Sequence, residues 1–234
     1  LARNKKPDPV FFFAGGPGQS AIEIAAQVGA MLGRFTNRRD IVLIDQRGVG
    51  KSAPLVCDAD DPARPLAEQF DIKRVREQQA QCFDNFKALP HGDLRFFTTT
   101  IAMADAEAVR VALGAEQINL VGGSYGTRAV LEYQRQFPQH VRRAVIDGVA
   151  PPDMVLPASS SSDNQAALDA LFAACEQDKA CATRELQLAE RWRALLASLP
   201  RAVTLVHPLT GRGESIELTR DTLLGMVRGP LYVP

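Results

Sequence analysis

The sequence predicts an α/β fold in which a mostly parallel sheet carries helices on both faces. Four short apolar runs predict strands, at residues 10–14, 40–45, 118–121 and 143–147. Segments whose apolar residues recur at helical spacing lie between them. Because strands and helices alternate along the chain, we expect the strands to be parallel and the crossover helices to cover both faces.

The first strand, Val10–Ala14, is a continuous apolar run, as expected for a buried strand. It ends at Gly15-Gly16-Pro17-Gly18, which predicts a tight turn. Ser20 is the expected N-cap of the helix that follows. The apolar face of this helix is predicted to contain Ile24, Val28, Met31 and Leu32.

The second strand, residues 40–45, is also apolar and is expected to be buried. It leads into the polar loop 46–52 and then into a Pro- and Asp-rich surface segment that reaches about Phe70. A charged helix is predicted for residues 72–86. Thr99 or Thr100 is expected to open an Ala-rich helix. The side of this helix that packs on the sheet is predicted to contain Ile101, Ala104, Ala108 and Val111.

The third strand runs into Gly122-Gly123-Ser124-Tyr125-Gly126 and then into an amphipathic helix, residues 128–137. A Gly-x-Ser-x-Gly sequence between a strand and a helix is typical of a nucleophile elbow, although a Gly-rich turn with an incidental serine is the alternative. The sharp turn is expected to strain the backbone of Ser124 and to expose its side chain. A Cβ at either flanking glycine would collide with the adjacent strand or helix. The free N–H of Tyr125, at the helix N-terminus, would face negative charge on a substrate oxygen.

The composition changes after the fourth strand, which ends at Asp147. Pro151, Pro152 and Pro157, with the run Ser159–Ser162, predict a linker. Helices are expected at about 164–176, 184–199 and 219–227, and a hairpin at 202–207 and 215–218. We therefore expect residues 1–150 to form the N-terminal part of an α/β core and residues 151–234 to form a mainly helical cap with a hairpin.

Charge and hydropathy exclude several classes of protein. The 234 residues include 27 basic and 27 acidic side chains, which gives no electrostatic case for binding nucleic acid or an acidic membrane surface. No apolar run approaches the roughly 18 residues of a membrane span. The first residue is Leu1 rather than Met, so we expect a processed or excised piece of a longer chain.

The four cysteines fall into two local groups, Cys57 with Cys82 and Cys175 with Cys181. Neither group has Cys-x-x-Cys spacing, and the three histidines are scattered, which argues against a zinc site. Two disulfides, and with them an oxidising compartment, are the favoured interpretation. Buried free thiols are the alternative.

Two other motifs compete with the nucleophile elbow. Gly50-Lys51-Ser52 resembles the end of a Walker A phosphate loop, but Asp45 places a carboxylate where the first glycine should cradle phosphate. Residues 16–21 satisfy a dinucleotide-binding fingerprint, with Asp45 as the ribose ligand. Pro17 removes a backbone N–H from that turn, and this fold would leave Ser124 without a purpose. No cofactor is therefore predicted.

Three motifs occur in order: Gly15-Gly16-Pro17-Gly18, then residues 45–52 (Asp-Gln-Arg-Gly-Val-Gly-Lys-Ser), then residues 122–127 (Gly-Gly-Ser-Tyr-Gly-Thr). Together they resemble the α/β-hydrolase peptidases of the proline iminopeptidase and tripeptidyl aminopeptidase group, and the resemblance continues through residues 141–149 into the cap. It implies an α/β-hydrolase fold, incomplete in this chain, with Ser124 as the nucleophile. It also implies an oxyanion hole formed by the N–H groups of Gly16 and Tyr125.

The resemblance carries further implications. Ala14 stands where better-known members have a histidine, so the backbone donor survives but a side chain that orders the loop is lost. Asp45 and Arg47 are expected to brace the floor of the active site rather than to act in catalysis. The two cysteine pairs resemble disulfides of the exported tripeptidyl branch, which implies a secreted or periplasmic location in a bacterium.

The resemblance also implies residues that this chain lacks. In this fold, the acid and the histidine of the triad follow the serine, on loops after later strands. His140 is expected at the surface, and His91 and His207 are expected to be structural. Asp147 lies near the elbow but precedes the cap, whereas the triad acid follows it. We therefore expect the triad Asp and His on a missing C-terminal segment of the same hydrolase. The expected partners of this chain are that segment and a peptide substrate.

The predicted function is that of a serine aminopeptidase, which releases short peptides or proline from peptide N-termini through an acyl-enzyme on Ser124. One alternative is an esterase or lipase-type hydrolase of the same fold. Another is an inactive hydrolase-like module, because the chain offers no convincing general base. Carboxylates of the cap are expected to bind the amino terminus of the substrate, and the candidates are Glu176, Asp178 and Glu185.

Overall fold

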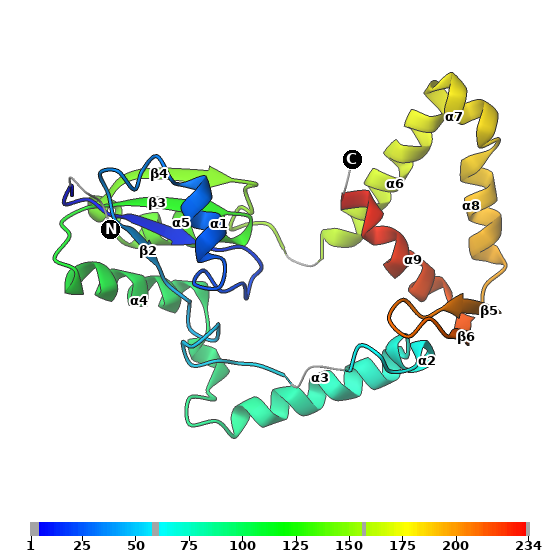
Figure 1. Cartoon of the computed structure of the whole chain (residues 1–234), viewed down its shortest axis with the longest axis horizontal. Helices are drawn as coiled ribbons and strands as arrows, with labels where there is room; N and C mark the ends of the chain where they lie inside the picture. The colour runs from blue at the N-terminus through cyan, green and yellow to red at the C-terminus, as the bar shows by residue number, and fades with distance from the viewer. Residues whose placement is uncertain (1–4, 58–60, 156–157, 233–234) are drawn as a thin grey trace. The chain divides into compact units, whose positions relative to one another are not determined.

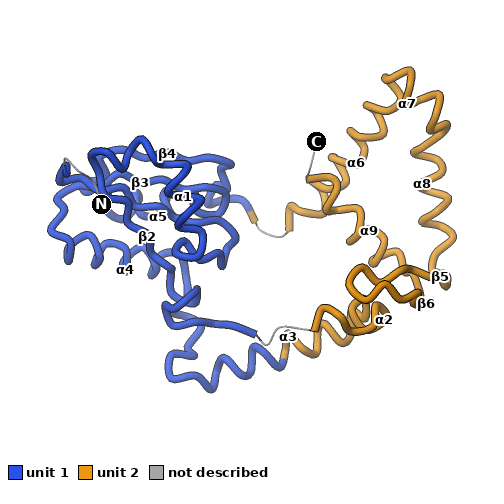
Figure 2. Tube along the Cα trace, in the orientation of Figure 1, with its two compact units in different colours: residues 1–58, 81–154 blue, residues 59–80, 155–234 orange. Residues whose placement is uncertain are grey.

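The computed structural model describes residues 5–57, 61–155 and 158–232, which form two compact units. Unit 1 comprises residues 1–58 and 81–154, and unit 2 comprises residues 59–80 and 155–234 (Figure 2). The segment 59–80, which we expected to belong to the core, clusters with unit 2. That residues 151–234 form a cap over the catalytic edge stays a prediction.

Unit 1 is built on a four-stranded parallel sheet with the strand order β2-β1-β3-β4 (Figure 1). β1 pairs with β2 and β3, and β3 pairs with β4, in parallel throughout. The parallel sheet predicted from the alternation of strands and helices is thus confirmed. The strands are β1 (Val10–Phe13), β2 (Ile41–Leu43), β3 (Ile118–Gly123) and β4 (Val141–Asp147).

Helices cover both faces of this sheet, as predicted. Successive side chains of β1 point to opposite faces, so each face has its own core. α1 (Ala25–Met31) lies on one face, where its Val28 packs with Val10 and Phe12. α4 (Thr99–Ala112) and α5 (Tyr125–Gln136) lie on the other face. The core there includes Phe11, Phe13, Met103, Leu120, Val130 and Tyr133.

The buried side of α4 differs from the predicted one. Ala104, Ala108 and Val111 are exposed, and the residues buried in their place are Ala102, Met103, Ala106 and Arg110. In an Ala-rich helix several faces are apolar enough to pack on a sheet, so the sequence does not single out the buried face. A charged residue such as Arg110 is also not expected on a buried face. Arg110 is buried because its guanidinium donates to the carboxylate of Glu107 and to the carbonyl of Ala115, which offsets the cost of desolvating it.

The first helix begins later than predicted. Ser20 does not cap α1, which starts at Ala25. The hydroxyl of Ser20 instead accepts a hydrogen bond from the N–H of Glu23 at 3.0 Å, within the preceding turn. Met31, which was expected on the apolar face, is 62% exposed. Ser20 is held away from the helix because its hydroxyl also donates to the carboxylate of Asp45 at 2.7 Å.

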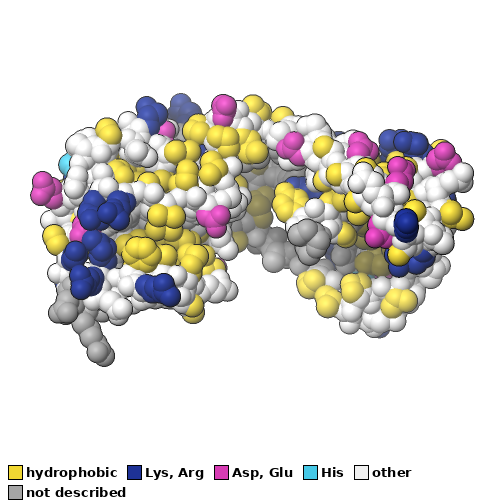
Figure 3. Space-filling model, turned by 90° about the horizontal axis from the view of Figure 1, so that it is seen from above, with side chains coloured by type: hydrophobic (Ala, Val, Ile, Leu, Met, Phe, Trp, Pro, Cys, Tyr) yellow, Lys and Arg dark blue, Asp and Glu magenta, His cyan; other side chains and the backbone are white. Residues whose placement is uncertain are grey.

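The outer edge of the sheet at β4 is largely uncovered. Within the described residues β4 pairs only with β3, and residues 142–147 are exposed. Val145 and Ile146, which point to opposite faces, are 55% and 37% exposed. Figure 3 shows hydrophobic side chains gathered on the side of unit 1 where β4 lies in Figure 1. This exposure is unusual, because strands of parallel sheets are normally covered on both faces. β2, expected to be buried, is only half-buried at the opposite edge.

The long connection from β2 to α4 contains more helix than the sequence suggested. α2 (Leu66–Gln69) lies in the Pro- and Asp-rich surface segment, for which no helix was predicted, and α3 (Ile72–Lys87) matches the predicted charged helix. The 3-10 helix η1 (Leu94–Phe96) precedes α4, and η2 (Pro138–His140) precedes β4. Cys82 of α3 forms a disulfide with Cys57, with the two Cα atoms 5.5 Å apart.

Unit 2 contains mainly helices, with one antiparallel hairpin. The hairpin and the last helix match the prediction, whereas Ser159–Ser162 lead into and begin α6 rather than forming a linker. Serines suit this place because their hydroxyls bond to nearby backbone groups, as Ser162 does with the carbonyl of Ser159. Pro157 lies outside the described residues. Besides α2 and the first part of α3, the elements are α6 (Ser160–Gln177), α7 (Lys179–Arg184), α8 (Leu188–Ala197), β5 (Arg201–Val206), β6 (Gly213–Leu218), α9 (Arg220–Arg228) and the 3-10 helix η3 (Pro230–Tyr232).

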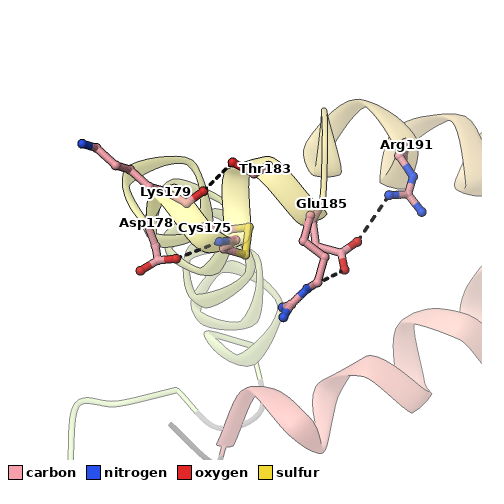
Figure 4. The surroundings of a disulfide bond; sticks show 8 residues. Cys175, Asp178, Lys179, Thr183, Glu185 and Arg191 are labelled. Atoms are coloured by element: carbon pink, nitrogen blue, oxygen red, sulfur yellow. Dashed lines mark hydrogen bonds and ion pairs between the residues drawn. A yellow bond between two sulfur atoms is a disulfide. The ribbon is translucent and has the colours of Figure 1, made fainter.

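The second disulfide joins Cys175 of α6 to Cys181 of α7 across the turn between the two helices (Figure 4). Within the turn, the carboxylate of Asp178 accepts a hydrogen bond from the N–H of Cys181 at 2.7 Å and caps α7. Both predicted disulfides are therefore formed, and none of the four cysteines is a free thiol.

Candidate active site

Ser124 stands at the junction between β3 and α5. It is the N-cap of α5 and has φ 53° and ψ −122°. A positive φ is uncommon for a residue with a side chain and costs on the order of 1 kcal/mol or more. The residue is exposed. The strained turn predicted from the sequence is thus confirmed, whereas the catalytic role of Ser124 stays a prediction.

Two glycines permit the close packing of this turn. A Cβ on Gly122 would collide with the backbone of Gly126, at the start of α5. A Cβ on Gly126 would collide with the carbonyl group of Phe13, at the end of β1. Gly123, in contrast, has no heavy atom within 4 Å of the place where its Cβ would be. The predicted need for glycine at 122 and 126 is confirmed by these contacts.

The side chain of Thr127 links the turn at Ser124 to the chain after β4. Its buried hydroxyl donates to the carbonyl of Ser124 at 2.7 Å and accepts from the N–H of Ala150 at 2.9 Å. The N–H of Ser124 donates to the carbonyl of Asp147 at 2.9 Å. These bonds join the start of α5 to the segment that leaves β4, so the backbone of Ser124 is fixed on the side away from its side chain.

The loop after β1 lies against Ser124. A Cβ built on Gly15 would be 3.4 Å from the Cβ of Ser124. Gly16 has φ 104°, a conformation that favours glycine. Within the described ranges, the N–H groups of Gly16 and Tyr125 have no acceptor. Two free backbone donors therefore flank the serine, one on this loop and one at the first residue of α5.

Gln19 supplies a contact that orders this loop. Its Oε1 accepts a hydrogen bond from the N–H of Gly15 at 3.2 Å. The family resemblance implies that Ala14 replaces a histidine that orders this loop in better-known members. The amide of Gln19 offers a different contact within the same loop.

Tyr125 lines a cavity of about 110 Å³ beside the same loop. Its phenolic oxygen is 2.6 Å from the hydroxyl oxygen of Thr99, the first residue of α4. The remaining wall includes Gly15, Pro17 and Gln19. A larger cavity of about 670 Å³ lies around Arg47, Phe96 and Asp105, and no residue between 122 and 127 lines it. Of these two cavities, the small one adjoins the elbow.

Asp45 and Arg47 make the contacts of bracing residues. Buried Asp45 accepts hydrogen bonds from the hydroxyl of Ser20 and the N–H of Ile22. Arg47 binds the carboxylate of Asp105 through Nε and Nη2, at 2.7 and 2.6 Å. Hydrogen bonding to this carboxylate raises the pKa of the Arg47 guanidinium. A Cβ on Gly50 would collide with the carboxylate of Asp45, which shows how tightly loop 46–52 folds over it.

None of the three histidines, all within the described residues, has a hydrogen bond to Ser124. His140 precedes β4, at the end of the sheet opposite the elbow, about 20 Å along the strand from Asp147. His91 lies 3.4 Å from the carbonyl of Pro54 and packs on Phe97. His207 is fully buried in unit 2, where its Nδ1 accepts from two backbone N–H groups and its Nε2 lies 3.1 Å from the carbonyl of Arg64.

Two of the three candidate carboxylates for binding an amino terminus have local partners. Asp178 caps α7, and Glu185 forms ion pairs with Arg184 at 3.2 Å and Arg191 at 3.4 Å (Figure 4). These contacts give both side chains a structural role within unit 2. Glu176, in the last turn of α6, has no hydrogen-bond or ion-pair partner among the described residues.

The charged groups with the clearest pKa shifts support the packing of α4 and α5. A hydrogen bond from Arg110 lowers the pKa of Glu107, and burial raises the pKa of Tyr133, which donates to Glu107 at 2.6 Å. On α5, hydrogen bonding from Arg135 lowers the pKa of Glu132 to about 2. These groups fix the helix that follows Ser124, and they are not reactive groups of the site.

The described residues offer little to hold a metal or a cofactor. They contain no group of three or more His, Cys, Asp or Glu side chains arranged to bind a metal ion. Asp45, which would be the ribose ligand in the rejected dinucleotide interpretation, is buried and hydrogen-bonded to Ser20. None of the helices in the described residues has both the length and the apolar character needed to cross a membrane.

Sequence reasoning missed Thr127, Thr99 and Gln19. Thr127 is the last residue of the motif 122–127, but the motif indicates no role for its hydroxyl. The partner of its hydroxyl, Ala150, is 23 residues away. Thr99 and Tyr125 are 26 residues apart, and no local pattern links them.

Comparison with known proteins places these features in a family context. Residues 8–203 match the family described as the alpha/beta hydrolase fold. The tripeptidyl aminopeptidase of Streptomyces lividans is 33% identical over 165 residues, which are 64% of this chain and 30% of that protein. The hydrolase YuaR of Escherichia coli is 30% identical over 234 residues, which are 96% of this chain and 45% of that protein. The chain thus spans less than half the length of these relatives. Among solved structures, the proline iminopeptidase of Mycobacterium smegmatis aligns with 21% identity and a TM-score of 0.45, over 99% of this chain and 63% of that chain.

Proposed function

The chain belongs to the α/β-hydrolase fold family, and from this premise we propose that it carries the nucleophile, Ser124, of a serine peptidase. The observation that carries the proposal is the strained, exposed serine with two unpaired backbone N–H groups beside it. In an acyl-transfer site these elements perform attack on a carbonyl and stabilisation of the resulting oxyanion.

The reaction proceeds in two steps. The Oγ of Ser124 attacks the scissile carbonyl carbon while its proton passes to a general base, and the carbonyl electrons move onto oxygen. The N–H groups of Gly16 and Tyr125 donate to that oxyanion. Collapse breaks the C–N bond, the base returns its proton to the leaving amine, and an acyl-enzyme remains. Water then attacks the ester with the same proton transfers and releases Ser124.

The general base and its carboxylate come from a segment outside these 234 residues. The contacts of His91, His140 and His207 support this, because each lies in a setting that gives its ring another role. The free edge of β4 is a suitable place for the segment. A parallel strand added there would extend the sheet at its open edge and bring its carboxyl end to the edge where Ser124 stands. The crossover helices that accompany parallel strands would cover Val145 and Ile146.

The substrate is a peptide with a free amino terminus, from which short peptides or proline are released. This step rests on similarity to a tripeptidyl aminopeptidase, and residues 151–234 act as the cap that restricts access. The two disulfides support a location in an oxidising compartment, secreted or periplasmic.

The test is labelling of the protein, as its gene encodes it, with a fluorophosphonate probe, beside the Ser124→Ala variant. We expect the label on Ser124 of the unsubstituted protein and none on the variant. Absence of label on both would overturn the proposal and leave an inactive hydrolase-like module. The label on a residue other than Ser124 would also contradict it.

A second comparison separates peptidase from esterase. Hydrolysis of an aminoacyl amide and of a p-nitrophenyl ester of similar size is measured with the unlabelled protein that reacts with the probe and with the Ser124→Ala variant. Turnover of the amide that requires Ser124 is expected. Turnover of the ester alone would assign the site to an esterase.

A further inference from the structure

The two helices that cover the same face of the sheet begin next to each other at the elbow. Thr99 is the first residue of α4 and Tyr125 is the first residue of α5. Their side-chain oxygens are 2.6 Å apart, in a half-buried setting. This is a direct hydrogen bond between the starts of two helices, formed one residue after Ser124.

The α4 end of this bond is firmly held. The hydroxyl of Thr98 accepts the N–H of Ile101 and caps the helix. Ala102, Met103 and Ala106 are buried in the core within the next two turns. Thr99 is therefore attached to a packed helix, and its hydroxyl has a defined position relative to the sheet.

The α5 end lies in a strained part of the chain. Tyr125 follows a residue with φ 53°, and its own N–H has no acceptor within the described residues. Strain of this kind persists only where the surrounding contacts over-determine the conformation. Thr127 fixes the turn on the side of β4, through its bonds to Ser124 and Ala150. The bond from Thr99 to Tyr125 fixes it on the side of β1 and the loop 15–19.

We propose that Thr99 is a positioning residue, which holds the phenol of Tyr125 so that the backbone N–H of Tyr125 points to the oxyanion. This inference rests on the proposed function, because it assigns a device for aligning one of the two proposed donors. The phenol and the loop that carries Gly16 line the same cavity of about 110 Å³. A shift of Tyr125 would therefore change its position relative to that loop.

The test uses Thr99→Val, which removes the hydroxyl at nearly constant volume, and Thr99→Ser, which keeps it. Tyr125→Phe removes the other partner. The rate of phosphonylation of Ser124 is measured against probe concentration in the protein as its gene encodes it. We expect Thr99→Val and Tyr125→Phe each to lower the maximal rate roughly fivefold, with the half-saturating concentration unchanged. Thr99→Ser should retain most of the rate.

A spectroscopic measurement reports the position of Tyr125 itself. In protein labelled with 3-fluorotyrosine, the ¹⁹F signal that disappears in Tyr125→Phe is assigned to Tyr125. Thr99→Val should move the Tyr125 signal, and Thr99→Ser should move it less. Thr36→Val is the matched control, because within the described residues the Thr36 hydroxyl bonds only to the carbonyl of Gly33. It should leave both the signal and the rate unchanged.

The failures are distinguishable. Absence of labelling in the unsubstituted protein overturns the proposed function and this inference with it. Normal labelling of Ser124, together with an unchanged maximal rate and an unchanged Tyr125 signal in Thr99→Val, overturns the positioning role alone. A rate loss in Thr99→Val that Thr99→Ser shares in full would also overturn it, because the hydroxyl would then not be the cause.

Discussion

On the side of β1 and α4, Ser124 lies against the loop 15–19 and beside Tyr125, whereas on the side of β4 it adjoins residues 147–150. The first side rests on buried elements: β1 is buried along its length, and Met103 and Tyr133 are fully buried below it. The second side is exposed from residue 142 to residue 149. The two N–H groups proposed to stabilise an oxyanion thus lie on the packed side. The side proposed to receive the segment with the general base, at β4, is exposed.

This difference follows from how the parts are encoded. The donors lie in turns at the ends of β1 and β3, and neighbouring parallel strands bring their carboxyl ends to one edge. A short piece of chain is enough to build them. The general base is proposed to lie on a further strand and loop beside β4, and within the described residues β4 pairs only with β3.

The packed side is expected to be sensitive to a single methyl group. Gly126→Ala places a Cβ against the carbonyl of Phe13, and the backbone must move to relieve the clash. We expect a loss of roughly 3 kcal/mol in the free energy of unfolding, measured by urea denaturation. Gly123→Ala is the control, because its Cβ would enter open space. Equal losses in the two variants would show that the elbow is not tightly packed.

The junction between the two sides depends on one hydroxyl. Thr127→Val keeps the shape of the side chain but leaves the N–H of Ala150 without its acceptor. We expect a loss of roughly 2 kcal/mol in unfolding free energy and faster hydrogen exchange at Ala150. Thr127→Ser should restore the slow exchange. If Thr127→Val leaves the exchange at Ala150 unchanged, the hydroxyl bridge does not hold the segment after β4.

The packed side should also respond to acid. Hydrogen bonding from Arg135 lowers the pKa of Glu132 to about 2, below the ordinary value of 4.5. The stabilisation is therefore present above about pH 4.5 and is lost as the pH falls toward 2. We expect roughly 1 to 2 kcal/mol, since the exposed Arg135 is screened by solvent. Urea denaturation at several pH values should show a smaller acid-induced loss in Glu132→Gln. An identical pH dependence in the variant would contradict this contribution.

The open side should tolerate a charge in this chain. Val145→Lys on β4 is expected to change the unfolding free energy of the 234-residue chain by less than about 0.5 kcal/mol, because the side chain is 55% exposed. If another segment covers β4 in the protein as its gene encodes it, the same substitution should be clearly destabilising there. Val111→Lys, at an exposed position of α4, is the control for both. Equal tolerance in both forms would show that β4 is a free surface.

Much of unit 1 could be predicted because its signals are local. The strands are short apolar runs, and the elbow is a fixed sequence between a strand and a helix. Prediction was weaker where several choices looked alike. In α4 the abundance of alanine hid the buried face, and only the pairing of Arg110 with Glu107 shows why that arginine lies inside.

The sequence by itself determined the alternation of strands and helices in unit 1, the strained serine turn, the glycines it needs and the local pair of Cys175 with Cys181. Each depends on residues close together in the chain, or on the period of apolar side chains. Only the tertiary structure decided that Thr99 meets Tyr125, that Thr127 meets Ala150, and that β4 is left exposed. These contacts join residues that are distant in sequence, and they depend on the register and packing of whole elements, which no local pattern encodes.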